Sequence, residues 1–195
     1  MELIFVRHSI AKGNLRHMFL GRTDTPLTPE GVALARETSA RMPAVERVYH
    51  SPMLRTTQTA SLLWPGTPME AVAGLREMDF GVFDGFTHEE LLPTPVYTQW
   101  LAQTEWTGYP GGETFDEIRA RMNEAFRYIV CDGQARGLAR AGCVAHGGTF
   151  VTFMELYTER RINLTDKLVK NCGGYAVDLT LHNGAVKCLG IRPLD

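Results

Sequence analysis

The chain has 195 residues, of which 44% are hydrophobic and 22% are charged. A chain of this length is typical of one globular domain that buries roughly 70% of its unfolded surface, and this composition excludes a disordered tail, a collagen-like repeat and a coiled coil. The 20 basic and 22 acidic residues give a formal net charge of -2, which offers no overall attraction to nucleic acid or to an anionic membrane. An anionic small substrate would therefore need a local cluster of positive groups.

The cysteines and the N-terminus indicate the cellular compartment in which the protein is expected. Cys131, Cys143, Cys172 and Cys188 contain no C-x-x-C pair and lie in apolar surroundings, which favours buried thiols in a reducing compartment over disulfides. The N-terminus has no basic leader, and no apolar run approaches the ~18 residues that a membrane span requires. We therefore expect a soluble, cytoplasmic protein with neither nucleic acid nor membrane as a partner.

The first half of the chain is typical of two strand-then-helix units. The apolar run over 3–6 predicts a parallel strand buried on both faces, and 48–49 predicts a short second strand. A Thr-Pro cap predicts a helix over 28–42, and Ser51-Pro52 repeats that signature before a helix that ends at about Leu63.

The second half begins with a segment, at about 78–112, that is rich in Gly, Pro, Thr and aromatic residues and resembles an excursion over the sheet edge. Apolar residues at helical spacing over 115–129 predict a long amphipathic helix. Another buried strand is predicted over 142–145, followed by a helix that starts near Thr149. Asn183-Gly184 is a hairpin signal that predicts two final strands.

These elements predict one α/β domain over 1–195, a three-layer α/β/α sandwich with a mostly parallel central sheet. Ligands bind such sheets beyond the carboxyl ends of the strands. His8 and His146 follow two of these ends, Arg7 precedes the first histidine, and Arg55 lies early in the helix after the second strand. Two arginines and two histidines at one edge would suit a dianion, because guanidinium groups match phosphate oxygens bidentately.

Motif spacing excludes several competing chemistries. The chain lacks a nucleotide-binding G-x-x-x-x-G-K-[ST] loop, a G-x-G-x-x-G fingerprint and a G-x-S-x-G nucleophile elbow. It also lacks a cysteine phosphatase loop, a D-x-D pair and metal-ligand spacing. The remaining candidate nucleophile is a histidine that works without a metal or cofactor. Four other histidines lack such partners and are expected to be structural or solvent-facing: His17, His50, His88 and His182.

Six sequence blocks occur in a fixed order: 6–9 with Asn14, 21–31, 51–55 with 59–60, 75–81 with 84–85, 110–114 with Arg121, and 145–147. In this order they resemble the histidine phosphatase superfamily, in its phosphoglycerate mutase-like branch named for an Arg-His-Gly motif. The resemblance spans nearly the whole chain. Two positions depart from it, since Ser9 stands where glycine is usual and Asp84 where glutamate is common.

The resemblance implies that His8 is the nucleophile that takes the phosphoryl group as a phosphohistidine, while Arg7, Arg55 and His146 hold the phosphate oxygens. Fixed cations stabilise the charge that spreads over those oxygens during transfer. The arginines would also lower the pKa of His8 and keep its ring neutral. The same match gives these substrate-binding positions: Asn14, Gly147, Ser9 and Gly21.

Glu77 is the expected proton donor to the leaving alkoxide. It must be protonated to serve in that role. After the alcohol leaves, the same carboxylate can take a proton from the water that attacks the phosphohistidine.

The resemblance leaves the reaction and the substrate open. Only about thirty residues separate Glu77 from Pro110. This segment is too short to contain the longer insertion of the cofactor-dependent mutases. We therefore predict a phosphomonoester hydrolase that acts on a small molecule, with α-ribazole phosphate and sugar phosphates as candidates. The alternatives are a cofactor-dependent phosphoglycerate mutase and a catalytically silent phospho-ligand binder, which Ser9 alone supports. A homodimer is plausible.

Aromatic residues gather in the 78–112 segment, and two interpretations of them stay open. They could form the core of a small subdomain, or they could line an apolar mouth together with 18–20. In the second case the substrate has a carbon-rich or cyclic alcohol part. The residues concerned are Phe80, Phe83, Phe86, Trp100, Trp106 and Tyr109.

Overall fold

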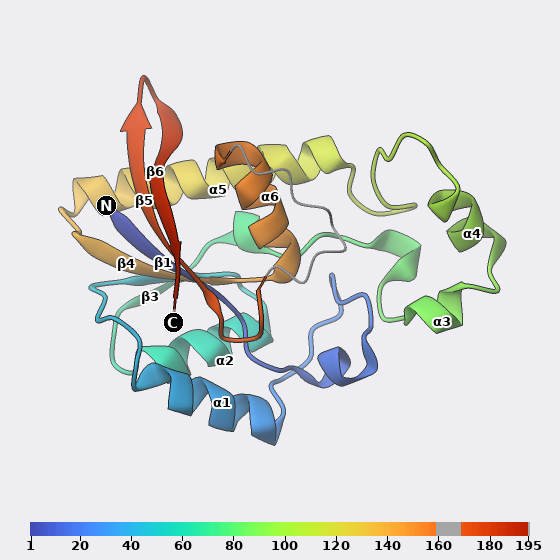
Figure 1. Ribbon diagram of the computed structural model, residues 1–195, viewed down its shortest axis with the longest axis horizontal. Helices are drawn as coiled ribbons and strands as arrows, with labels where there is room; N and C mark the ends of the chain where they lie inside the picture. The colour runs from blue at the N-terminus through green and yellow to red at the C-terminus, as the bar shows by residue number, and fades with distance from the viewer. Residues whose placement is uncertain (159–168, 195) are drawn as a thin grey trace.

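A six-stranded sheet between two layers of helices forms the centre of the computed structural model, which describes residues 1–158 and 169–194 (Figure 1). The strands are β1 (Glu2–Arg7), β2 (Val48–His50), β3 (Met69–Ala71), β4 (Arg140–Ala145), β5 (Gly174–His182) and β6 (Ala185–Pro193). The α-helices are α1 (Pro29–Ser39), α2 (Leu54–Leu63), α3 (His88–Leu91), α4 (Pro95–Leu101), α5 (Phe115–Ala135) and α6 (Gly147–Tyr157). Short 3-10 turns are η1 (Lys12–Arg16), η2 (Ala73–Leu75) and η3 (Gly81–Phe83).

The strand order is β3-β2-β4-β1-β5-β6. The first four strands are parallel, and β5 and β6 join antiparallel as the predicted hairpin. Helices α1 and α2 cover one face of the sheet, and α5 and α6 cover the other (Figure 1). The predicted three-layer α/β/α sandwich with a mostly parallel sheet is therefore confirmed.

The strand register brings the predicted site residues together. β1 pairs with β4 so that Arg7 lies beside Ala145, and the His8 N–H donates to the Ala145 carbonyl at 2.9 Å. His8 and His146 are therefore neighbours where both strands end. Because β2 pairs with the other side of β4, Ser51 follows at the same edge.

Strand β1, which ends just before His8, is anchored on both faces, because side chains alternate along a strand. Phe5 is wholly buried and stacks on Phe150 with ring centroids 3.8 Å apart, with Phe126 edge-on at 5.5 Å. On the opposite face, Ile4 and Val6 are equally buried and pack in the cluster with α2. This burial confirms the predicted central strand.

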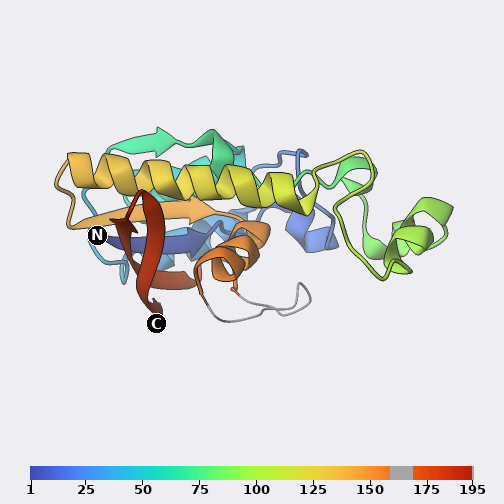
Figure 2. The same cartoon turned by 90° about the horizontal axis from the view of Figure 1, so that it is seen from above.

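A lobe formed by α3, α4 and their connections projects from one end of the sheet (Figure 2). Its core contains four of the six aromatic residues under question: Phe83, Trp100 and Tyr109 are buried, and Phe80 packs against them half-buried. Phe86 and Trp106 are 49% and 40% exposed. The subdomain interpretation therefore holds for Phe83, Trp100 and Tyr109, whereas Phe80 also lines a cavity together with residues 18–20.

The predicted cap at Ser51 is wrong. Helix α2 begins at Leu54, and the side chain of its N-cap residue, Met53, makes no capping hydrogen bond; the Leu54 N–H donates to the Asp24 carboxylate at 2.7 Å. The Ser51 hydroxyl instead lies 2.8 Å from Nε2 of His146. A serine that follows a strand can contact either the N-terminus of the next helix or a residue at the end of the neighbouring strand. Ser51 contacts His146, which follows the neighbouring strand β4.

Other boundaries shift by a few residues. Helix α1 starts as predicted, with the Thr28 hydroxyl accepting from the Gly31 N–H, but it ends at Ser39. Helix α6 starts at Gly147, two residues before the predicted position. Strand β3 was not predicted, because its three residues are half-buried or exposed and form no apolar run. The four cysteines are free thiols, Cys143 and Cys172 buried and Cys131 and Cys188 half-buried.

Within residues 1–158 and 169–194, no helix combines the length and the apolar character needed to cross a membrane.

Gly31 tests how closely α1 packs on the chain that follows His8. Alanine in place of glycine normally stabilises a helix by about 1 kcal/mol, but a Cβ on Gly31 would lie 2.2 Å from the Ile10 carbonyl oxygen. We expect Gly31→Ala to lower the free energy of unfolding by about 1–3 kcal/mol, measured by urea denaturation. The matched control is Gly133→Ala in α5, whose Cβ would meet the flexible Met1 side chain and should change stability far less. A Gly31→Ala protein as stable as the parent would contradict this packing.

Candidate active site

His8 is 3% exposed and lies directly after β1. Its Nδ1 lies 2.7 Å from the Ser9 carbonyl oxygen. A carbonyl can only accept, so Nδ1 carries the ring proton and Nε2 keeps its lone pair. Burial and then the charge of Arg55 lower the pKa of His8 to about 3. The ring is thus neutral at physiological pH, with one nitrogen free to act as a nucleophile.

Arg55 is wholly buried in the first turn of α2. Its Nη2 donates to the Leu20 carbonyl at 2.9 Å, and its Nη1 donates to the Thr23 carbonyl at 3.1 Å. Asp24 forms an ion pair with it, with an oxygen 3.4 Å from Nη1. The guanidinium is therefore held mainly by neutral carbonyls, which leaves much of its positive charge available to a bound anion.

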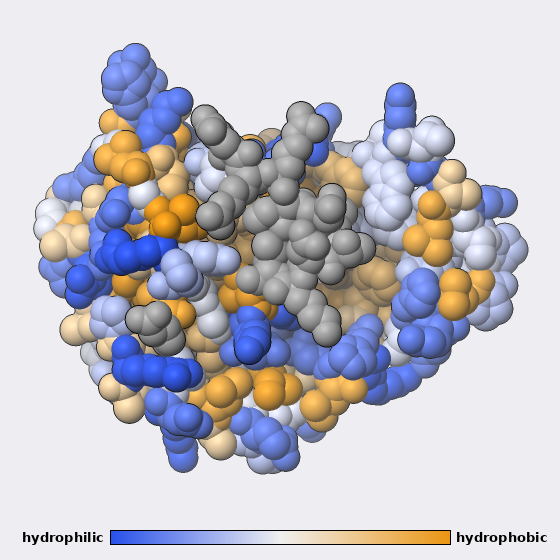
Figure 3. All heavy atoms as spheres, in the orientation of Figure 1, coloured by the Kyte–Doolittle hydropathy of each residue, from blue (hydrophilic) through white to orange (hydrophobic). Residues whose placement is uncertain are grey.

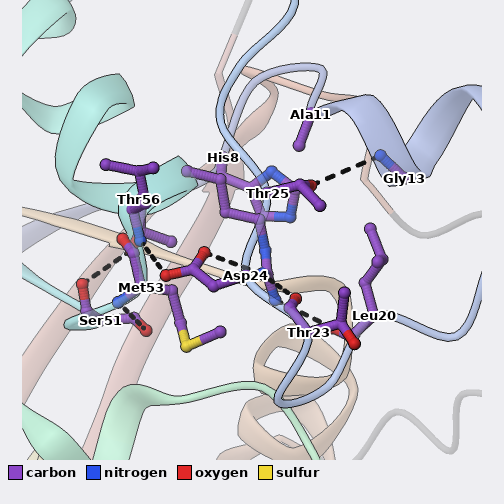
Figure 4. Close-up of polar contacts among 12 residues, drawn as sticks. His8, Ala11, Gly13, Leu20, Thr23, Asp24, Thr25, Ser51, Met53 and Thr56 are labelled. Carbon is purple, nitrogen blue, oxygen red and sulfur yellow. Dashed lines mark hydrogen bonds and ion pairs between the residues drawn. The ribbon is translucent and has the colours of Figure 1, made fainter. Parts of the chain in front are cut away.

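The loop that supplies these carbonyls is held by Asp84. Its carboxylate accepts from the Gly21 N–H and the Thr23 N–H, both at 2.7 Å, and from the Thr23 hydroxyl at 2.8 Å. A Cβ on Gly21 would lie 2.4 Å from the Met78 carbonyl oxygen, so the loop approaches that segment as only glycine allows. Figure 4 draws this loop with His8, and dashed lines mark its contacts through Asp24.

His146 is wholly buried, and its ring centroid lies 5.2 Å from that of His8. Ser51 accepts from the Met53 N–H at 3.4 Å and lies 2.8 Å from Nε2 of His146. We assign the serine hydrogen to that contact, which places the His146 proton on Nδ1. Burial, followed by the charge of Arg55, lowers the pKa of His146 well below its ordinary value.

Three buried nitrogens at this site have no hydrogen-bond partner in the part of the chain that the structure describes: Nε of Arg7, Nε of Arg55 and Nδ1 of His146. Buried polar groups are almost always paired, so a cluster of unpaired N–H donors needs an explanation. An oxyanion with several acceptor oxygens would satisfy all three. Arg7 is otherwise fixed by a 2.8 Å hydrogen bond from Nη1 to the Val169 carbonyl.

Glu77 is held at the start of α6. Its Oε1 accepts from the Met78 N–H at 3.0 Å and its Oε2 from the Gly148 N–H at 3.2 Å. A Cβ on Gly148 would lie 2.3 Å from Oε1, so glycine permits this approach. Gly147, the first residue of α6, lies beside Arg7, whose Cζ is 3.8 Å from the Cβ position. The helix N-terminus thus presents its backbone next to both functional side chains.

A cavity of about 320 Å³ opens above these groups. In Figure 3 the surface is hollowed between the body of the molecule and the lobe of α3 and α4. Four predicted residues line the cavity, namely Arg7, His8, Asn14 and Glu77. The other lining residues are His17, Met18, Phe19, Leu20, Phe80, His88 and Tyr97.

The remaining predicted residues lie around this wall. Arg55 and His146 are wholly buried next to His8. Ser9 is also wholly buried, and its hydroxyl donates to the Gly31 carbonyl at 2.7 Å, on the side of α1. Gly21 belongs to the loop that holds Arg55.

His17 and His88 are exposed, as expected, but both also line the cavity with His8, which the sequence did not indicate. They belong to segments far apart in the sequence, and no motif links them. Asn171, which was also missed, donates from Nδ2 to the His8 carbonyl at 2.9 Å. No group of three or more His, Cys, Asp or Glu residues able to hold a metal ion occurs among the described residues.

The family model for the histidine phosphatase superfamily (branch 1) matches residues 3–192. The chain belongs to this superfamily.

Curated relatives carry two kinds of name. "Putative phosphoserine phosphatase 2" of Hydrogenobacter thermophilus is 30% identical over 163 residues, covering 80% of this chain and 78% of that protein. "Probable phosphoglycerate mutase GpmB" of Yersinia pestis is 28% identical over 189 residues, covering 91% and 85%.

Solved structures show the same division. The phosphoglycerate mutase from Thermus thermophilus superposes with a TM-score of 0.69 at 31% identity over the full length of both chains. A putative alpha-ribazole-5'-P phosphatase from Escherichia coli superposes with a TM-score of 0.80 at 22% identity, covering 100% of this chain and 96% of that one, and shows the shared fold.

The protonation state of His8 can be measured by NMR. We expect its ring nitrogens to keep the shifts of a neutral Nδ1–H tautomer from pH 8 to pH 5, because its pKa is lowered to about 3. Below pH 6.5 the unfolded chain binds more protons at His8 than the folded protein does. The free energy of unfolding therefore decreases as the pH falls from 6.5 towards 3. His8→Gln identifies the resonances. A titration midpoint between pH 6 and pH 7 would contradict the lowered pKa of His8.

Proposed function

We propose that this protein is a phosphomonoester hydrolase that works without a metal ion, through a phosphohistidine at His8. The observation that carries the proposal is the position of His8, whose Nδ1 lies 2.7 Å from the Ser9 carbonyl so that Nε2 keeps its lone pair, next to three buried N–H donors with no acceptor among residues 1–158 and 169–194. A binding protein needs the donors but not the free nucleophilic nitrogen. Membership in the histidine phosphatase superfamily and a relative named as a phosphatase support the same reaction.

In the first step, Nε2 of His8 attacks phosphorus, and the bond from phosphorus to the ester oxygen breaks. The side chains of Arg7 and Arg55, with Nδ1–H of His146, stabilise the charge on the equatorial oxygens. Protonated Glu77 gives its proton to the departing oxygen, so the product leaves as an alcohol. Its backbone hydrogen bonds hold the carboxyl at the cavity wall for this transfer.

In the second step, water attacks the phosphohistidine and Glu77 takes a proton from it. The bond from phosphorus to Nε2 breaks, inorganic phosphate leaves, and His8 returns to its neutral form. Glu77 is again protonated, so the two steps close a cycle in which one ester and one water give one alcohol and one phosphate.

The identity of the acceptor separates a hydrolase from a mutase. We favour water, because the segment between Glu77 and Pro110 is short and a relative at 30% identity is named a phosphatase. Candidate substrates are α-ribazole phosphate, which a structural neighbour's name suggests, and sugar phosphates. The cytoplasmic location and the homodimer remain predictions.

The roles of His8 and Glu77 are tested by phosphate release in EDTA. We expect His8→Ala to abolish turnover of every ester. Glu77→Gln should lower kcat on an alkyl phosphate by ~10²–10⁴-fold and on 4-nitrophenyl phosphate far less, because nitrophenolate leaves without a proton. Phosphate affinity should stay near normal in Glu77→Gln.

The control is Glu37→Gln, which changes an exposed carboxylate on α1 and should keep parental rates. Equal losses on both esters in Glu77→Gln would remove Glu77 from the acid role. Isomer formation from 3-phosphoglycerate with its bisphosphate cofactor, without phosphate release, would make the protein a mutase. A folded protein that binds phosphate but turns over no ester would be a binder.

A further inference from the structure

His17 and His88 line the cavity above His8, but the transfer chemistry uses neither. His17 follows η1, and His88 begins α3. An antiparallel bridge pairs Met18 with Thr87. Residues that flank such a bridge lie opposite each other, so the two histidines are neighbours across it.

The two segments that carry these histidines are joined by further contacts. The Phe19 N–H donates to the Phe86 carbonyl at 2.9 Å, and the Gly85 N–H donates to the Phe19 carbonyl at 2.8 Å. Arg16 and Glu90 form an ion pair at 2.6 Å. The histidine pair therefore has a fixed backbone frame at the cavity wall.

Each imidazole keeps hydrogen-bonding capacity for a ligand. Nδ1 of His88 lies 2.7 Å from the Tyr97 hydroxyl, and burial raises the pKa of Tyr97, so this hydroxyl stays protonated. That contact orients the His88 ring and leaves Nε2 as its second polar atom. Neither Nε2 of His88 nor the ring of His17 has a hydrogen-bond partner in the part of the chain that is described.

The charges and apolar groups around the pair limit what it can bind. Glu89 is an exposed carboxylate close enough to interact electrostatically with both imidazoles, so a second anionic group on the substrate would meet repulsion. Apolar side chains line the same cavity, among them Phe19 and Phe80, whose rings meet edge to face at 5.3 Å. These side chains suit the faces of a ring rather than a short polar chain.

We propose that His17 and His88 hydrogen-bond a neutral polar group at the edge of a ring carried by the substrate's alcohol part, while Phe19 and Phe80 contact the ring itself. The substrate class is a phosphomonoester of a ring-bearing alcohol with a polar edge. This inference rests on the proposed phosphoryl transfer at His8, which places the phosphate at the other end of the same cavity.

The test compares two esters of equal size and similar leaving group, benzyl phosphate and 3-pyridylmethyl phosphate. One hydrogen bond is worth about 1 kcal/mol, so we expect the parent protein to prefer the pyridylmethyl ester by about fivefold in kcat/KM, through KM. His88→Ala and His17→Gly should abolish this preference. Glycine suits position 17, where φ is 55°.

Two further variants separate positioning from bulk effects. Tyr97→Phe should reduce the preference in part, because it removes only the hydroxyl that orients His88. His182→Ala, on the exposed end of β5, is the matched control and should keep the parental ratio. The affinities of both esters for His8→Ala protein are measured by calorimetry, so the ratio is obtained without turnover.

The outcomes distinguish this inference from the proposed function. If no ester is hydrolysed but His8→Ala protein still binds the pyridylmethyl ester more tightly, the hydrolase proposal fails. The proposal that His17 and His88 bind the polar edge of the ring then stands. Equal kcat/KM values of the parent protein on the two esters would overturn the proposed roles of His17 and His88. So would a His88→Ala protein that still prefers the pyridylmethyl ester. Tighter binding of 3-phosphoglycerate than of either ring ester also overturns it.

Discussion

The parallel register between β1 and β4 is the constraint on which the rest of the site depends. The hydrogen bond from the His8 N–H to the Ala145 carbonyl, at 2.9 Å, places His8 and His146 side by side at the point where both strands leave the sheet. A slip of one residue would turn every side chain of the strand to the other face. The stacking of Phe5 on Phe150 makes such a slip costly, because it would expose or bury the wrong side chains.

Burying Arg55 creates an electrostatic requirement that the surrounding loop meets. A buried cation without partners is very unstable, yet a tight carboxylate pair would neutralise the charge that a phosphate needs. Carbonyls of Leu20 and Thr23 stabilise the guanidinium without cancelling its charge. Asp84 acts one step further away, since it binds the loop N–H groups instead of Arg55 itself. The site therefore stays positive while both terminal nitrogens of Arg55 are hydrogen-bonded.

The sequence was sufficient to predict the layers and the meeting of His8 and His146 at one edge of the sheet, because these depend on short-range patterns. An apolar run that ends in Arg7-His8, and another that ends before His146, mark two strand ends, and parallel strands share one edge. His17 and His88 could not be found in this way, because their meeting depends on an isolated bridge between Met18 and Thr87. Ser51 was misassigned for a related reason, since its partner lies on another strand.

Ser9, the one departure from the family's motif at the nucleophile, shows how the fold accommodates a side chain where glycine is usual. Its hydroxyl donates to the Gly31 carbonyl, and its N–H donates to the Thr59 hydroxyl at 3.0 Å. Both contacts lie toward the helices on the α1 side, so the serine leaves the His8 ring free and its own carbonyl available to Nδ1. That carbonyl fixes the tautomer that the proposed attack by Nε2 requires. The substitution is therefore compatible with catalysis, and it gives no structural reason to favour a silent binder.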